Sequence, residues 1–207
     1  MTERNERNGR NGRKERNHRT TSPADVLTDL RAIDGALYAA VAATPTPALD
    51  SALRRLSRAA DHSKISLTVA AGLALVPGRP RQAAVVGVAA VALASVAANL
   101  IGKRMVHRRR PDRERARVIV SRQVPMPESA SFPSGHTASA TAFATAVSVV
   151  LPPAAVPLGA LAVAVGYSRV HTGVHYPGDV AAGAVLGFAA AAAALAVVHV
   201  PLQLAEG

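Results

Sequence analysis

Three short polar clusters in the sequence contain the residue types that bind and transform an anion. They lie at 103–110, 133–136 and 168–179, each beside a long apolar run. Their candidate members are, in chain order, Lys103, Arg110, Ser134, Gly135, His136, Arg169, His175 and Asp179. Cations with several donors, the start of a helix and two histidines together suit a negatively charged group such as phosphate.

The cationic members and the helix start have complementary uses. Arg110 and Arg169 can each offer a planar fork of donors to phosphate oxygens, and Lys103 adds a compact positive charge. Ser134 and Gly135 would open a helix, where free backbone N–H groups and the helix dipole favour an anion and glycine permits close approach. Such groups would stabilise the charge that develops on phosphate oxygens in a transition state.

Histidine is the available nucleophile and proton donor, because the chain has no cysteine and no acidic cluster suited to metal. His171, His175 and Asp179 recur every four residues, a spacing that on one helix could bind a metal ion. Pro177 and Gly178 interrupt any such helix. We therefore predict no metal and no cofactor.

Apolar runs indicate the elements that must position these residues. Residues 82–102 and 180–200 are uncharged, and about 21 helical residues rise about 31 Å, enough to cross a bilayer core. Shorter runs rich in small residues, which suit close helix packing, occupy 65–76, 137–151 and 154–167. We predict an all-α, polytopic membrane bundle of about five transmembrane helices. A soluble alanine-rich bundle is the alternative, but it would have to account for two uncharged stretches of spanning length.

The N-terminal third differs in composition from the rest. Residues 1–22 contain no apolar residue after Met1 and predict a disordered basic tail. Residues 23–62 predict two amphipathic interfacial helices, ahead of a transmembrane domain at 63–203. On the first of these helices, an apolar stripe lies opposite Asp29, Arg31 and Asp34; its members are Val26, Leu30, Ile33, Leu37 and Val41.

Positive charge is concentrated in two blocks. The chain carries 24 Lys and Arg against 13 Asp and Glu, a formal net charge of +11. Much of the excess lies in the tail and in residues 102–117, which flank neutral apolar runs. This distribution favours a membrane with anionic lipids over nucleic acid as the partner. By the positive-inside rule we predict a multi-pass protein of the cell membrane whose polar clusters face the cytoplasm.

Taken together, the three clusters resemble the signature of the type 2 phosphatidic acid phosphatase superfamily, whose related fold also occurs in vanadium haloperoxidases. The resemblance covers residues 103–179 and every signature position. It implies that His175 attacks phosphorus and forms a phosphohistidine, that Asp179 orients His175, and that His136 protonates the leaving oxygen and then activates water. Lys103, Arg110, Ser134, Gly135 and Arg169 are the implied phosphate-binding residues. His171 is expected outside the catalytic set, and the other arginines of 102–117 are assigned to topology and lipid contacts.

The implied function is a metal-independent membrane lipid phosphatase acting on a phosphomonoester or a diphosphate. Candidate substrates are polyprenyl phosphates or diphosphates, phosphatidic acid, phosphatidylglycerol phosphate and polyprenyl-phosphoryl sugar phosphates. A cytoplasmic site would favour a biosynthetic intermediate, such as phosphatidylglycerol phosphate or a decaprenyl-phosphoryl phosphoribose-type lipid. Three alternatives stay open at this point: a vanadium-dependent haloperoxidase, a non-catalytic scaffold that binds anionic lipid, and a phosphotransferase. The oligomeric state is not predicted.

Overall fold

The computed structural model describes residues 22–104 and 106–198, and every regular element in these ranges is helical. The N-terminal half contains α1 (Pro23–Ala43), α2 (Pro47–Ala59), the 3₁₀ helix η1 (Asp61–Ser63), α3 (Lys64–Ala74) and α4 (Arg79–Arg104). A long loop with η2 (Val120–Arg122) leads to α5 (Gly135–Val150), η3 (Pro152–Ala154), α6 (Ala155–His171) and α7 (Pro177–Val198). The predicted all-α fold is confirmed, whereas the predicted basic tail lies outside the described residues except for Ser22.

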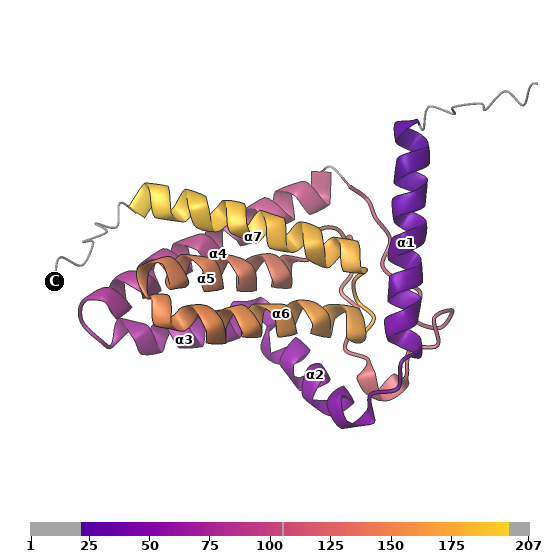
Figure 1. Cartoon of the computed structure of the whole chain (residues 1–207), viewed down its shortest axis with the longest axis horizontal. Coiled ribbons are helices and arrows are strands. Elements are labelled where there is room, and N and C mark those ends of the chain that lie inside the picture. Colours follow the sequence, from indigo (N-terminus) through magenta and orange to yellow (C-terminus); the bar gives the residue numbers. More distant parts are fainter. Residues whose placement is uncertain (1–21, 105, 199–207) are drawn as a thin grey trace, which may run out of the picture.

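Helix α5 lies in the middle of the bundle and packs against α4, α6 and α7, while α3 packs against α4 (Figure 1). The core between these helices is built largely from alanine, which lets helix axes approach closely. Two glycines of α7 show how close the approach is. A Cβ at Gly183 would lie 2.5 Å from the carbonyl oxygen of Ser134, and one at Gly187 would lie 2.6 Å from that of Ala138.

Three helical segments in the described part are long and apolar enough to cross a membrane: Arg79–Leu100, Pro152–His171 and Pro177–Val198. The uncharged runs of the sequence thus correspond to α4 and α7. The other two expected spans coincide with α3, of 11 residues, and α5, of 16 residues, which are shorter than a full crossing. Whether α3 and α5 also span the bilayer stays a prediction.

Helix α1 lies across the end of the bundle rather than along it (Figure 1). It begins with a capping box in which Ser22 and Asp25 satisfy each other's backbone N–H groups. Its predicted apolar stripe is exposed at Val26, Leu30, Ile33 and Leu37. Asp34 differs from expectation: it is buried with Tyr38 against the bundle, because its carboxylate has partners there that the helical pattern could not reveal.

The long loop between α4 and α5 is attached to the N-terminal helices by a buried cation. The Arg122 side chain is fully buried, its Nε lies 2.9 Å from Asp50 Oδ1, and its Nη2 donates to the Thr44 carbonyl oxygen at 2.8 Å. His171 joins the same cluster, with Nε2 3.2 Å from Asp50 Oδ1. These contacts place the loop over the end of the bundle where the polar clusters lie.

Candidate active site

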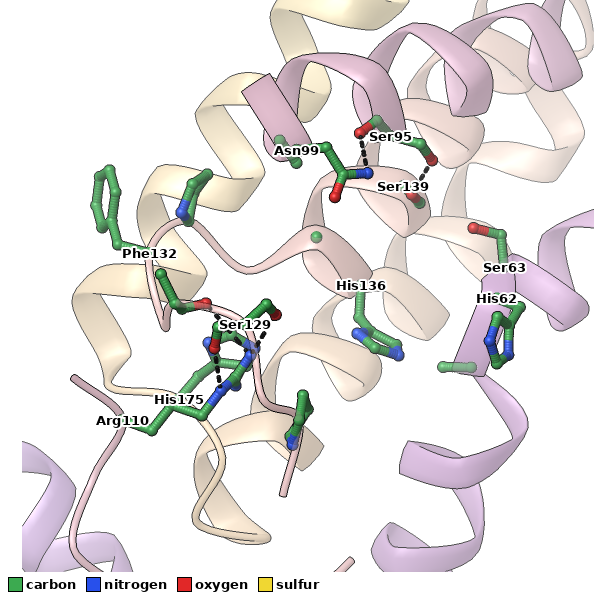
Figure 2. Close-up of a pocket in the computed structure, with 16 residues that line it drawn as sticks. His62, Ser63, Ser95, Asn99, Arg110, Ser129, Phe132, His136, Ser139 and His175 are labelled. Atoms are coloured by element: carbon green, nitrogen blue, oxygen red, sulfur yellow. Dashed lines mark hydrogen bonds between the residues drawn. The ribbon is translucent and has the colours of Figure 1, made fainter. Parts of the chain in front are cut away.

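A cavity of about 420 Å³ opens at this end of the bundle (Figure 2). Its wall is formed by η1, the C-terminal half of α4, the long loop, the start of α5 and the loop between α6 and α7. Four predicted site residues line it: Arg110, Gly135, His136 and His175. The three separated clusters of the sequence therefore do meet in one cavity.

His175 lies in the loop between α6 and α7 and is almost fully buried. Arg110 Nη1 lies 3.3 Å from His175 Nε2, and because a guanidinium can only donate, Nε2 acts as the acceptor. The ring proton is then on Nδ1, which lies 3.6 Å from Asp179 Oδ2. Burial lowers the pKa of His175, although Asp179 opposes that effect. The neutral ring thus has its lone pair on the nitrogen beside Arg110.

The Asp179 carboxylate is fully buried and is held from three sides. The Ser131 hydroxyl donates to Oδ2 at 2.5 Å, the Tyr176 backbone N–H donates to Oδ2 at 2.9 Å, and Arg108 Nη1 donates to Oδ1 at 2.9 Å. A carboxylate with these partners stays ionised and fixed in orientation. A fixed negative charge therefore lies beside Nδ1 of His175.

Arg108 corrects the sequence interpretation, which assigned it to topology and lipid contacts. Its guanidinium bridges two carboxylates, donating to Asp179 and, at 2.6 Å, to Asp34 Oδ2 of α1, and it lies 4.1 Å from the centre of the Tyr176 ring. Asp34 Oδ1 also accepts the backbone N–H of Gly178 at 2.7 Å, at the start of α7. A chain of contacts therefore runs from α1 to His175.

His136 has a carboxylate partner of its own, which the sequence interpretation missed. His136 Nε2 lies 2.8 Å from Asp61 Oδ1, in η1. Asp61 is outside the cavity lining, whereas its neighbours Ala60 and His62 are part of it. The carboxylate therefore holds one ring nitrogen of His136 from behind, and the ring itself faces the cavity (Figure 2).

Arg169 is placed differently from expectation. It is buried at the end of α6, and its Nη1 donates to the Ser57 hydroxyl at 2.6 Å and to the Ser57 carbonyl oxygen at 3.2 Å. The same nitrogen is 3.8 Å from Asp61 Oδ1. Arg169 therefore binds Ser57 near the end of α2 and is not among the residues that line the cavity.

The remaining predicted residues have simpler placements. Ser134 is buried and caps α5, its hydroxyl accepting from the Thr137 backbone N–H at 3.4 Å and from the Thr137 hydroxyl at 2.9 Å. Gly135 is the first residue of α5 and lines the cavity. Lys103 belongs to the last turn of α4, but its side chain lies outside the described part of the structure. Among the described residues, no three His, Asp or Glu side chains are grouped as metal ligands would be.

Comparison with known proteins finds a family model and several phosphatases that this chain is similar to. Residues 83–201 match the family model described as the PAP2 superfamily. A decaprenylphosphoryl-5-phosphoribose phosphatase of Mycobacterium tuberculosis is 36% identical over 146 residues, which cover 68% of this chain and 76% of the relative. The protein of the same name from Mycolicibacterium smegmatis is 38% identical over 156 residues, covering 74% and 82%.

Solved structures show the same fold. A transmembrane PAP2 type phosphatidylglycerolphosphate phosphatase from Bacillus subtilis superposes with a TM-score of 0.67 at 20% identity, covering 86% of this chain and 90% of that chain. The LpxE structure from Aquifex aeolicus superposes with a TM-score of 0.60 at 24% identity, covering 77% and 93%. At these levels of identity the similarity shows a shared arrangement of helices.

Proposed function

Because the chain belongs to the PAP2 superfamily, we propose that it hydrolyses a lipid-linked phosphate ester at the membrane surface through a phosphohistidine on His175. The observation that carries the proposal is the shared cavity, in which the acceptor nitrogen of His175 lies beside Arg110 and opposite His136. The two mycobacterial relatives are named as phosphatases of decaprenylphosphoryl-5-phosphoribose, and a polyprenyl-phosphoryl sugar phosphate is therefore among the substrates that we propose to test first.

The substrate phosphate would displace the contact between Arg110 and His175. A phosphomonoester carries about two negative charges near neutral pH. Arg110 and the backbone N–H groups at the start of α5 would bind its oxygens, with Lys103 as a further cation. Arg169 would join them by exchanging its contact with Ser57 for one with the phosphate. Binding would free Nε2 of His175 to face phosphorus, because the guanidinium then donates to the phosphate instead.

Two displacements would complete the reaction. In the first, Nε2 of His175 forms a bond to phosphorus while the bond to the leaving oxygen breaks, and His136 gives that oxygen a proton. Asp179 stabilises the positive charge on the phosphorylated ring. In the second, His136 takes a proton from water, whose oxygen attacks phosphorus, and the bond to Nε2 breaks. Inorganic phosphate and neutral His175 result.

Phosphate release from a panel of lipid phosphates by detergent-purified protein tests this function. We expect release by the wild type, loss of release by His175→Ala, and a phosphorylated protein intermediate after rapid quenching of the wild type. EDTA should leave the rate unchanged. Normal activity of His175→Ala would contradict the mechanism, loss of activity with chelator would indicate a metal, and phosphate found on an alcohol would indicate transfer rather than hydrolysis.

We further propose that the site faces the cytoplasm. Arg109, Arg115 and Arg117 are exposed on the loop beside the cavity and remain available to anionic headgroups. The chain has no cysteine, so Pro125→Cys, at an exposed loop position, would carry the sole thiol. A membrane-impermeant thiol reagent should leave it unlabelled in intact cells and label it after lysis. Labelling in intact cells would place the site on the outer face of the membrane and contradict this proposal.

A further inference from the structure

The cavity extends well beyond the groups that would hold a phosphate. Its volume of about 420 Å³ lies within the range of pockets that bind whole small molecules. Arg110 and His175 lie at one end, and the side chains of Ser95, Asn99 and Ser139 lie at the other (Figure 2). We call these three residues the polar cluster. Their chemistry describes the part of the substrate that the phosphate end does not contact.

The polar cluster is unusual for its place in the bundle. Between residues 83 and 100, α4 has polar side chains only at Ser95 and Asn99, in a helix apolar enough to cross a membrane. The two residues are four apart and so share one face of the helix, and both line the cavity. Polar groups at such positions cost free energy and usually mark a binding site or a pathway.

Contacts within the polar cluster show how it could bind a ligand. The hydroxyls of Ser95 and Ser139 are 3.2 Å apart and link α4 to α5, and Asn99 Nδ2 donates to the Ser95 carbonyl oxygen at 2.9 Å. Each hydroxyl can donate and accept, and the amide supplies both functions. Such a surface matches a group that carries several hydroxyls. A hydrocarbon chain would leave the remaining donor and acceptor capacity of these groups unused.

The direction of phosphoryl transfer assigns the polar cluster to the leaving group. The attacking and leaving atoms lie roughly in line on opposite sides of phosphorus. His175 attacks from one end, so the leaving oxygen points away from it. His136, which would protonate that oxygen, and Ser139 are three positions apart on one face of α5, and both line the cavity. An alcohol that receives its proton from His136 would therefore extend toward Ser95, Asn99 and Ser139.

We infer that this site selects substrates whose leaving group is a polyol, and that the polar cluster binds its free hydroxyls. The inference rests on the proposed function and narrows its substrate class. A phosphorylated sugar on a polyprenyl lipid satisfies it with several free hydroxyls, and the glycerol headgroup of phosphatidylglycerol phosphate satisfies it with a single one. Polyprenyl phosphate and phosphatidic acid, whose leaving alcohols carry no further hydroxyl, do not.

The test compares kcat/KM on four substrates: a polyprenyl-phosphoryl pentose phosphate, phosphatidylglycerol phosphate, polyprenyl phosphate and phosphatidic acid. The variants are Ser95→Ala/Ser139→Ala and Asn99→Leu. Ser148→Ala serves as the control, because Ser148 is also on α5 but donates to the Ala144 carbonyl oxygen at 2.6 Å and is not a lining residue. Substrate ratios within one preparation do not depend on how much protein is correctly folded.

We expect the wild type to prefer the polyol substrates by about tenfold or more, since lost hydrogen bonds to buried hydroxyls lower transition-state binding by about that factor. The double variant should reduce this preference to below about threefold, Asn99→Leu should also lower it, and Ser148→Ala should retain it. Of the two substrates with hydroxylated leaving groups, the one with the higher kcat/KM shows whether the polar cluster binds a sugar or a glycerol headgroup. Equal wild-type rates on all four substrates, or an equal loss on all four in the variants, would overturn the inference. No hydrolysis of any of them by the wild type would instead overturn the proposed function.

Discussion

The two histidine–carboxylate pairs of the cavity differ in burial and in origin. His175 and Asp179 are nearly or fully buried and come from one loop and the helix that follows it. His136 and Asp61 have side chains 23% and 41% exposed and come from helices far apart in sequence. The first pair suits a nucleophile that must keep one orientation without water, and the second suits proton exchange with water. The predictions below test this division of labour.

The largest effect is expected at the buried pair. Asp179→Asn should lower kcat by about 10³–10⁴, as the loss of the orienting carboxylate does in other triads, because an amide can neither fix the tautomer of His175 nor stabilise its positive charge. Steady-state assays on the best lipid substrate measure this. Asp29→Asn, on the exposed side of α1, is the control and should be neutral. A loss below tenfold in Asp179→Asn would show that the buried pair is not the nucleophilic one.

Asp61→Asn should have a smaller effect that depends on the leaving group. We expect a loss of about 10- to 100-fold on a lipid phosphate, since proton transfer contributes about 10²–10⁴ in all and Asp61 acts through His136. With nitrophenyl phosphate, whose leaving group needs little protonation, the loss in the first displacement should be below about threefold. Asp61→Glu should restore part of the lipid activity. Equal losses on both substrates would assign Asp61 a structural role instead.

Breaking the contacts that link Asp34 of α1 through Arg108 to Asp179 should lower kcat by a still smaller factor. Arg108→Gln should lower kcat by about tenfold, because Asp179 then loses its charged partner. Asp34→Asn should lower kcat by less, because it removes only the carboxylate that holds Arg108 in place. The double variant should be no worse than the worse single variant, since both act on one carboxylate. Additive losses would mean that the two residues act independently. Arg109→Gln, on the exposed neighbour of Arg108, is the matched control and should leave kcat unchanged.

The smallest expected effect is a shift in the pH dependence of kcat/KM, which should differ between variants of the two histidine–carboxylate pairs. Burial holds the pKa of His175 below its ordinary value, which is about 6.5, so the neutral nucleophile persists as the pH falls and activity is lost only as the pH passes below that value. Asp179 raises the pKa of His175, so its replacement by Asn should move the acidic limb of kcat/KM to lower pH. Asp61→Asn should move that limb less. The substrate's own ionisation is common to all three profiles and cancels in their differences.

Much of the architecture was predictable because hydrophobic runs and helix-end motifs are local signals. The runs ending near residues 102 and 200 correspond to α4 and α7, and the order of the three polar clusters at helix ends predicted their meeting. Arg110, His136 and His175 do line one cavity. Their catalytic roles stay predictions.

The misplacements have a common physical cause. Asp61, Asp34 and Arg108 are single charged residues whose partners lie more than 70 positions away, so no spacing pattern could identify them. Arg169, an expected phosphate ligand, contacts Ser57 of α2, and its binding to phosphate stays a prediction. Charge counting also assigned Arg108 and Arg113 to the membrane side, whereas Arg108 binds two carboxylates and Arg113 donates to the Gly173 carbonyl oxygen at 3.2 Å.

Helix α1 and η1 precede the segment that matches the family model, which begins at residue 83. Yet Asp61, the carboxylate of the His136 pair, and Asp34, which holds Arg108 beside Asp179, lie within them. We therefore expect the smallest unit capable of normal turnover to extend N-terminally beyond residue 83. Anyone transplanting this active site, or grafting a foreign N-terminus onto it, should carry the segment from α1 to η1 along.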